Sequence, residues 1–455
     1  MKLCASIVAA VLTVAVLPAP SSAQDQPWLQ DRRYTEGIGI RTGDLELHPG
    51  VAAEFGYDSN YFRRADGDTE QPVGSLRLRI TPSFSLSTLG RQRQDATPDA
   101  PPPDFEFRAG IAATYDEFFP VSGPEDGQDL MSDQRNVGGT LDLRLSILPK
   151  RPWSGVLEAE LGRSISPSDQ GLTDASFNRI RAGAGGELIW TPGGGLFDWR
   201  LGYHFNGTIF EASDFQSLTN LQHEVQTRGR WRFLPRTALL YDARFGFISY
   251  PDGAEKTSSH PLRTQLGVNG LITPSFGLLA MAGWGASFYT PEGQNDFDSV
   301  IGQLEVKWFL TPNPSTDPAA ATLTLSSLAV GFIRDFHDSY IGTYFERDRG
   351  YLKLTYFFGG RFLVVVDGGA GPIVYPDIPG ADIPGGDGTD QAAFTDIRID
   401  ASLFGEYRLK DSFGINSTVR YGTNVSDTVF TNVAGEPNSL QWQQFEAFLG
   451  VRWFM

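Results

Sequence analysis

The chain has 455 residues, with 54 Asp and Glu against 37 Lys and Arg, and its formal net charge is −17. This excess of acid argues against nucleic acid as a partner, because binding phosphate needs a concentrated positive surface. The 51 glycines and 12% aromatic residues are unusual for helical domains and typical of strands, turns and the aromatic girdles of membrane barrels.

Residues 1–23 have the pattern of a secretory signal peptide. Lys2 precedes the apolar run LCASIVAAVLTVAVL, and a small-residue cleavage site ends at Ala23. The run is short for a helix that spans a bilayer. We therefore expect export. Because Cys4 is the sole cysteine, we also expect a mature chain without disulfides, thiolate metal sites or a cysteine nucleophile.

Residues 24–44 are predicted to form a periplasmic N-terminal segment, which is a candidate to tuck into the mouth of the following domain. From residue 45 the sequence alternates with period two. In SLRLRITPSFSLS, for example, Leu76 and Leu78 alternate with Arg77 and Arg79, as in strands with one apolar and one polar face. Eighteen strands are predicted, over residues 45–58, 74–89, 104–118, 136–148, 154–166, 177–191, 197–211, 220–234, 237–250, 262–273, 276–289, 298–311, 321–335, 343–358, 361–375, 395–409, 412–425 and 440–455.

The connectors between these strands alternate between two kinds. One set is mostly tight, such as LPRT at 234 and KDS at 410, and the other is longer and acidic, such as VSGPEDGQDLMSDQ and PDIPGADIPGGDGTDQAA. This asymmetry is typical of an outer-membrane barrel with short periplasmic turns and long extracellular loops. We therefore predict an all-β fold, a closed antiparallel transmembrane barrel of about eighteen strands over residues 45–455, in the outer membrane of a Gram-negative bacterium.

The segment EAFLGVRWFM at 446–455 is predicted to be the strand that closes the barrel. In hydrocarbon every backbone amide must be paired within the protein, so the last strand has to pair with the first. Leu449, Val451 and Trp453 should then face lipid. The spacing of these apolar residues resembles the signal read by the outer-membrane assembly machinery, which we expect as a partner during insertion.

The polar faces of the strands should line the lumen, because eighteen strands enclose more space than side chains can fill. The predicted pore-lining residues are Arg77, Arg79, Arg144, Arg179, Arg181, Arg200, Arg228, Arg230, Arg232, Arg244, Glu158, Glu160 and Asp242. Hairpin register places Glu160 near Arg181 and Asp242 near Arg228, so one interpretation is that these charges simply pair.

A second interpretation concerns the strands predicted at 197–211, 220–234 and 237–250. We expect Arg200 to lie opposite Arg230, with Arg228 and Arg232 also inward. Like charges facing each other need an anion or carboxylate between them. This arrangement predicts a positively biased wall that favours anionic solutes.

Some positions on the inward faces are apolar instead of polar. Either the predicted register slips at these positions, or an object inside the barrel covers them. They are Leu240, Ile248, Leu279, Met281, Ile301, Phe309, Leu363 and Val365.

No motif indicates catalysis. The five histidines are scattered without HExxH spacing, and neither a GxSxG elbow nor a P-loop occurs. We expect no enzyme activity, no cofactor and no metal.

The segment ELHPGVAAEFGYDSNYFR at 46–63, followed by a barrel that fills the rest of the chain, resembles a family of outer-membrane β-barrel porins (the β-barrel porin 2 type). The turn formed by Tyr57, Asp58, Ser59 and Asn60 matches that family's first strand end. The resemblance implies association with Wzx/Wzy-dependent exopolysaccharide export, in which the barrel acts with a periplasmic polysaccharide-export protein.

Two functions therefore compete, and both put a polysaccharide or small solutes in the lumen. The first is a polysaccharide secretion conduit, gated by its loops. The second is a general or anion-preferring diffusion porin. A third class, a structural or adhesive barrel, would transport neither.

Overall fold

The computed structural model describes residues 39–455 except 68–70, 89–102, 135, 166, 168–176, 252–255, 291–293, 311–325, 360, 384–385, 411 and 432–436. The signal peptide predicted at 1–23 and residues 24–38 of the predicted N-terminal segment lie outside the described residues.

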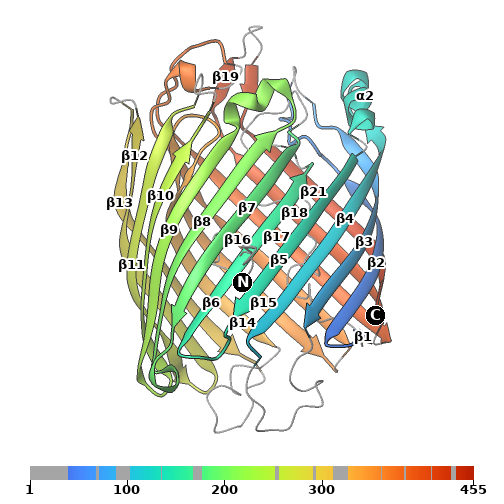
Figure 1. The fold of residues 1–455 in the computed structure, drawn as a ribbon. Coiled ribbons are helices and arrows are strands. Elements are labelled where there is room, and N and C mark those ends of the chain that lie inside the picture. The colour runs from blue at the N-terminus through green and yellow to red at the C-terminus, as the bar shows by residue number, and fades with distance from the viewer. Residues whose placement is uncertain are drawn as a thin grey trace, which may run out of the picture.

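The described strands form one closed, antiparallel barrel of eighteen tilted strands (Figure 1). The predicted fold class is thereby confirmed. Within the described residues, the barrel strands are β2 (Leu45–Asp58), β3 (Gly74–Thr88), β4 (Phe105–Ser122), β5 (Asn136–Ile147), β6 (Trp153–Ser164), β7 (Arg179–Trp190), β8 (Phe197–Phe210), β9 (Asn220–Leu234), β10 (Thr237–Ser249), β11 (Ser258–Thr273), β12 (Phe276–Thr290), β13 (Phe297–Phe309), β14 (Ser327–Asp338), β15 (Tyr344–Phe358), β16 (Phe362–Tyr375), β17 (Phe394–Lys410), β18 (Phe413–Val425) and β21 (Trp442–Phe454).

The barrel closes where β21 pairs with β2, from Gly50 opposite Phe454 to Asp58 opposite Glu446. A short strand, β1 (Ile40–Thr42), pairs with the start of β2, at residues 45–47. It therefore continues the line of β21 past the point where β21 ends, so the edge of β2 is covered along its length.

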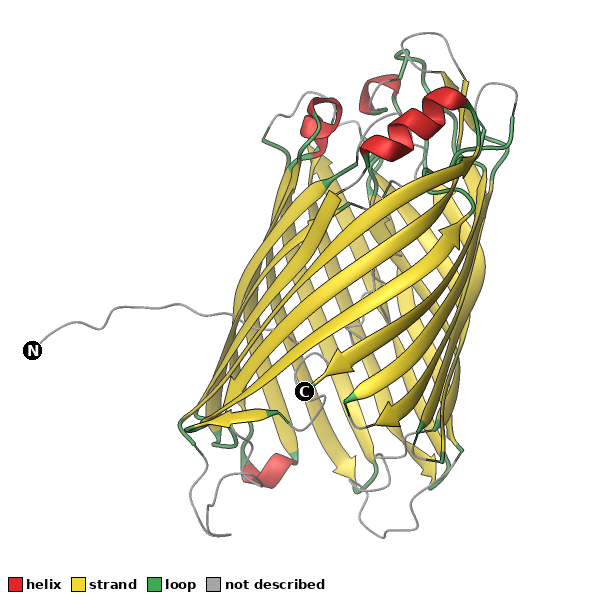
Figure 2. Cartoon of the chain, turned by 90° about the vertical axis from the view of Figure 1, so that its right-hand side faces the viewer, coloured by secondary structure: helices red, strands yellow, loops and turns green. Residues whose placement is uncertain are grey.

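The two ends of the barrel differ, as the connectors predicted. One end carries α2 (Glu125–Asp133), the 3-10 helices η2 (Ser213–Leu218) and η3 (Gly380–Asp382), and a small hairpin of β19 (Val429–Thr431) and β20 (Pro437–Ser439). At the other end (Figure 2) are η1 (Gly193–Gly195) and tight turns such as that between β9 and β10. Gly193 and Gly195 have φ of 66° and 89°, a backbone conformation that glycine adopts without strain.

Burial in this barrel is the reverse of that in a water-soluble protein. On β3, Arg77, Arg79 and Thr81 are buried, whereas Ile80 and Phe84 are exposed. The period of two therefore separates an apolar outer band from a polar interior, as in transmembrane barrels. No helix among the described residues is long and apolar enough to cross a membrane.

Candidate functional site: the charged lumen and its outer mouth

The lumen is charged because every second residue of each strand points inward. On the wall next to the seam, Arg77 is completely buried, and its guanidinium lies 3.0 Å from Asp58, 3.0 Å from Asp116 and 3.3 Å from Glu446. Arg79 donates to Asp116 over 3.0 Å. We call Arg77, Arg79, Asp58, Asp116 and Glu446 the seam network, since it joins β2, β3 and β4 to the last strand.

The outward face of the last strand is apolar. Leu449 is 64% exposed, Val451 44% and Trp453 41%. In the ladder with β2, these three residues lie opposite Phe55, Ala53 and Val51, respectively. Both sides of the seam therefore present apolar side chains outward.

The arginines of β8 and β9 face each other in a different register from the predicted one. Arg200 lies opposite Arg228, and Arg230 lies opposite Asp198, two positions from the expected register. Glu187 of β7 sits between the two facing arginines, 3.3 Å from Arg200 and 2.6 Å from Arg228. The expected pairing of Arg200 with Arg230 was wrong, and a carboxylate of the protein bridges the like charges.

The remaining predicted pore-lining residues occupy different surroundings. Arg244 donates to Asp242 over 2.7 Å, and Asp242 lies opposite Arg228 in register, as predicted. Arg144 lies 3.2 Å from Glu158, which is 2% exposed.

Five other predicted positions lie on β6, β7 and β9. Arg179 is buried, and its guanidinium lies over the ring of Phe177. Arg181 and Glu160 are exposed and lie opposite Gly162 and Gly183, so they are offset from each other by two positions. Arg230 is half-buried and Arg232 is exposed, near the turn end of β9.

A second ionic wall, which was not predicted, lies on β15–β17. Arg349 lies 3.3 Å from Asp367 and also pairs with Asp400, which accepts from Arg347 over 3.2 Å. The period-two run of Arg347, Arg349 and Tyr351 was the signal for this wall. Arginines and carboxylates therefore alternate around both sides of the lumen.

Buried apolar clusters join the loops of the outer mouth. The turn that carries the family resemblance folds inward, where Tyr61, Phe62, Val73, Phe118 and Met131 form a buried cluster. The Tyr61 hydroxyl donates to the carbonyl of Ile165, on the loop after β6, over 2.5 Å. Burial raises the pKa of Tyr61 well above its usual value, so this donor keeps its proton at physiological pH.

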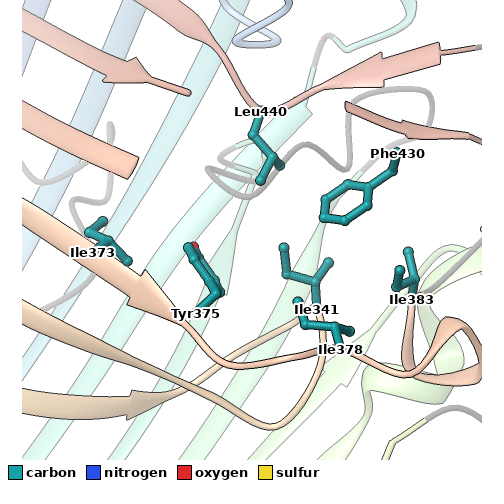
Figure 3. Close-up of a cluster of buried hydrophobic side chains, with 7 residues drawn as sticks. All are labelled: Ile341, Ile373, Tyr375, Ile378, Ile383, Phe430 and Leu440. Atoms are coloured by element: carbon teal, nitrogen blue, oxygen red, sulfur yellow. The ribbon is translucent and has the colours of Figure 1, made fainter. Parts of the chain in front are cut away.

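A larger apolar cluster joins other loops of the mouth (Figure 3). It contains residues from the end of β16 and from the segments after β14, β16 and β18, namely Ile341, Ile373, Tyr375, Ile378, Ile383, Phe430 and Leu440. A third cluster, Phe177, Phe210, Phe215 and Leu218, receives Tyr340 from the loop after β14. Loops from distant strands thus meet over the lumen.

Among the described residues, no group of three or more His, Cys, Asp or Glu side chains is arranged to hold a metal ion. Paired guanidinium and carboxylate groups line the described lumen, and aromatic side chains lie at its mouth.

Comparisons with known proteins give only distant matches. No family model and no curated protein matches the sequence. Among solved structures, OccAB4 of Acinetobacter baumannii has a TM-score of 0.45 and 10% identity, covering 91% of this chain and 99% of that one. A BenF-like porin from Pseudomonas fluorescens Pf-5 has a TM-score of 0.44 and 10% identity over the same shares. A bacterial polysaccharide outer membrane secretin has a TM-score of 0.32 and 9% identity, again over 91% and 99%. Similarity this weak does not indicate what passes through the barrel.

Proposed function

We propose that this chain is a channel of the outer membrane of a Gram-negative bacterium, and that it is the outer-membrane conduit for secretion of a polysaccharide. The observation that carries the proposal is a closed barrel with an apolar outer band and a lumen lined by paired arginines and carboxylates. Such a lumen suits a hydrophilic cargo, because its fixed charges are already compensated and hydroxyl groups can exchange hydrogen bonds with them.

Two features favour a secretion conduit over a diffusion porin. Buried side chains hold several loops of the outer mouth together, and Tyr340 joins loops of distant strands, whereas an ungated porin needs an open mouth. In addition, Glu187 bridges the arginines expected to attract anions, which lowers the positive potential that an anion-preferring porin requires.

The proposed partners follow from the family resemblance and from the ends of the barrel. The periplasmic polysaccharide-export protein would meet the turn end, and the assembly machinery would read the closing strand with Leu449, Val451 and Trp453.

Deletion of the gene tests the proposal. A secretion conduit predicts loss of surface polysaccharide with normal uptake of small solutes, and a diffusion porin predicts the reverse. The wild-type gene should restore secretion. The Leu449→Arg variant should not restore it, because a charge on the lipid face costs about 2–4 kcal/mol near the middle of the bilayer. Normal polysaccharide in the deletion strain would refute the proposal.

A further inference from the structure

At its outer end the barrel wall is open between β13 and β14, whereas β15 still pairs with β16 there, with Glu346 opposite Val374 and Arg347 opposite Ile373. The β13–β14 ladder stops at Gly302 opposite Arg334. However, β13 pairs with β12 as far as Phe297, and β14 pairs with β15 as far as Asp338. Within these described strands, residues 298–301 and 335–338 could extend the ladder, yet they are not paired with each other.

Three of the backbone groups released by this split bond to side chains instead. In a continued ladder Val300 would lie opposite Phe336, and the two residues would exchange backbone hydrogen bonds. Instead, the Val300 carbonyl accepts from Arg334 Nε over 3.1 Å. The Phe336 amide donates to Asp335 over 2.8 Å, and the Phe336 carbonyl accepts from Arg263 over 2.5 Å. Because unpaired backbone groups are costly in a membrane barrel, the split is a stabilised state of the wall.

Side chains in the outward register of the hairpin now lie inside the barrel. Phe336 has the same parity on β14 as the exposed Val330 and Phe332, yet it is buried and stacks on Phe297 with ring centroids 4.2 Å apart. Ile301 packs in the same cluster and is fully buried. Phe336 of β14 therefore covers Ile301, one of the apolar residues predicted on an inward face.

The tip of the hairpin, residues 339–343, contacts loops around the mouth. The buried ammonium of Lys256, after β10, donates to the carbonyls of Ser339 and Gly342. Tyr340 packs edge-to-face on Phe177 with centroids 5.3 Å apart. Ile341 lies in the cluster of Figure 3. One short segment therefore connects the loops that close the lumen.

We propose that the outer ends of β14 and β15, with the tip that joins them, are the gate of the channel. They swing, together with the paired end of β16, about residues 334–335 and 348–349, where the β15–β16 ladder is interrupted. Pairing of residues 298–301 with 335–338 returns them to the wall and opens the mouth. This inference rests on the proposed channel function. The Val300 carbonyl and the Phe336 amide and carbonyl have partners in both states, since they bond to side chains in the split wall and to the neighbouring strand in the zipped one. The alternating pattern of β14 fits the wall, because Phe336 would then face outward beside Val300.

Cysteine cross-linking tests the gate, since the sole cysteine of the sequence is Cys4. Ser299→Cys with His337→Cys places two cysteines at a non-hydrogen-bonded pair of the zipped ladder, where the short Cα separation suits a disulfide. Gln303→Cys with Ile333→Cys is the matched control, at an equivalent pair that is already formed. Each protein is reconstituted into planar bilayers of outer-membrane lipid, oxidised, and then reduced with dithiothreitol.

The expected result is a stable conductance for the oxidised 299/337 variant that is lost on reduction, whereas the control cross-links without a change in conductance. A variant with residues 338–344 replaced by the turn Asn-Gly should conduct permanently. Lys256→Met should open more often than the wild type. If the tip-deleted variant conducts but the 299/337 cross-link fails to form or leaves the channel closed, the hinge is refuted. If the tip-deleted variant does not conduct, the channel function itself is refuted.

Discussion

Replacing Arg77 with Met should destabilise the barrel strongly, because three carboxylates lose their shared cation. Asp58 and Asp116 are buried to the same extent as Arg77, and Glu446 is nearly so. Removing one partner of a buried ion pair costs about 3–5 kcal/mol, and the three contacts of 3.0–3.3 Å favour the upper part of that range. At about 1.4 kcal/mol for each factor of ten, the folding equilibrium constant should fall by about two to three and a half powers of ten.

Urea unfolding in lipid vesicles measures this effect through the shift of the midpoint at constant slope. Arg181→Met is the matched control, because Arg181 is an exposed arginine of the same lumen. Combining Arg77→Met with Asp58→Asn and Asp116→Asn should recover part of the loss, since the uncompensated charge is removed with the cation. A loss for Arg77→Met no larger than that for Arg181→Met would refute the role of the seam network.

Three further predictions follow from single contacts. Glu187→Gln, tested in the variant with residues 338–344 replaced, should shift the reversal potential in a salt gradient toward anion preference, because Arg200 and Arg228 lose the carboxylate between them. Glu160→Gln is the control. An equal shift in both variants would contradict the prediction. Gly283→Ala should cost about 1–3 kcal/mol of unfolding free energy, because its Cβ would collide with the Thr264 carbonyl. Gly350→Ala is the control, since the atom nearest to its Cβ would be 3.8 Å away. Equal losses for the two variants would refute this. The hydrogen bond from Arg163 lowers the pKa of the Glu211 carboxyl, so its stabilisation should be present above the ordinary carboxyl pKa and lost as pH falls through the lowered value. The pair is partly exposed, so its contribution should be about 0–1 kcal/mol, and Glu211→Gln should remove this acid sensitivity in pH-dependent melting.

The barrel could be predicted because its determinants are local. Alternation with period two and the asymmetry of the connectors do not depend on which residues meet across strands. Register could be predicted across a tight turn, since Asp242 lies opposite Arg228 on two strands joined by residues 235–236. The predicted register was two positions off for Arg200 and Arg230, whose strands are joined by a loop that contains η2. A longer loop is compatible with several strand registers. Glu187 could therefore not be identified from the sequence as the group that bridges the two arginines.

The closed mouth could be anticipated only in part. Ile301 on an inward face indicated either a slipped register or a covering object, and the structure shows the covering object to be the β14–β15 hairpin. No local pattern indicated this because the residues that hold the tip, Lys256 and Tyr340, make contacts with distant loops. Such contacts depend on the three-dimensional path of several loops together.

The seam network has a consequence for biogenesis. Arg77 and Glu446 are separated by 369 positions in the chain, so their contact forms only after the C-terminal strand arrives. Interactions that form after the rate-limiting step of folding mainly slow the reverse reaction. A finished barrel would therefore be protected against reopening by a bond that plays no part in guiding the early strands into the bilayer.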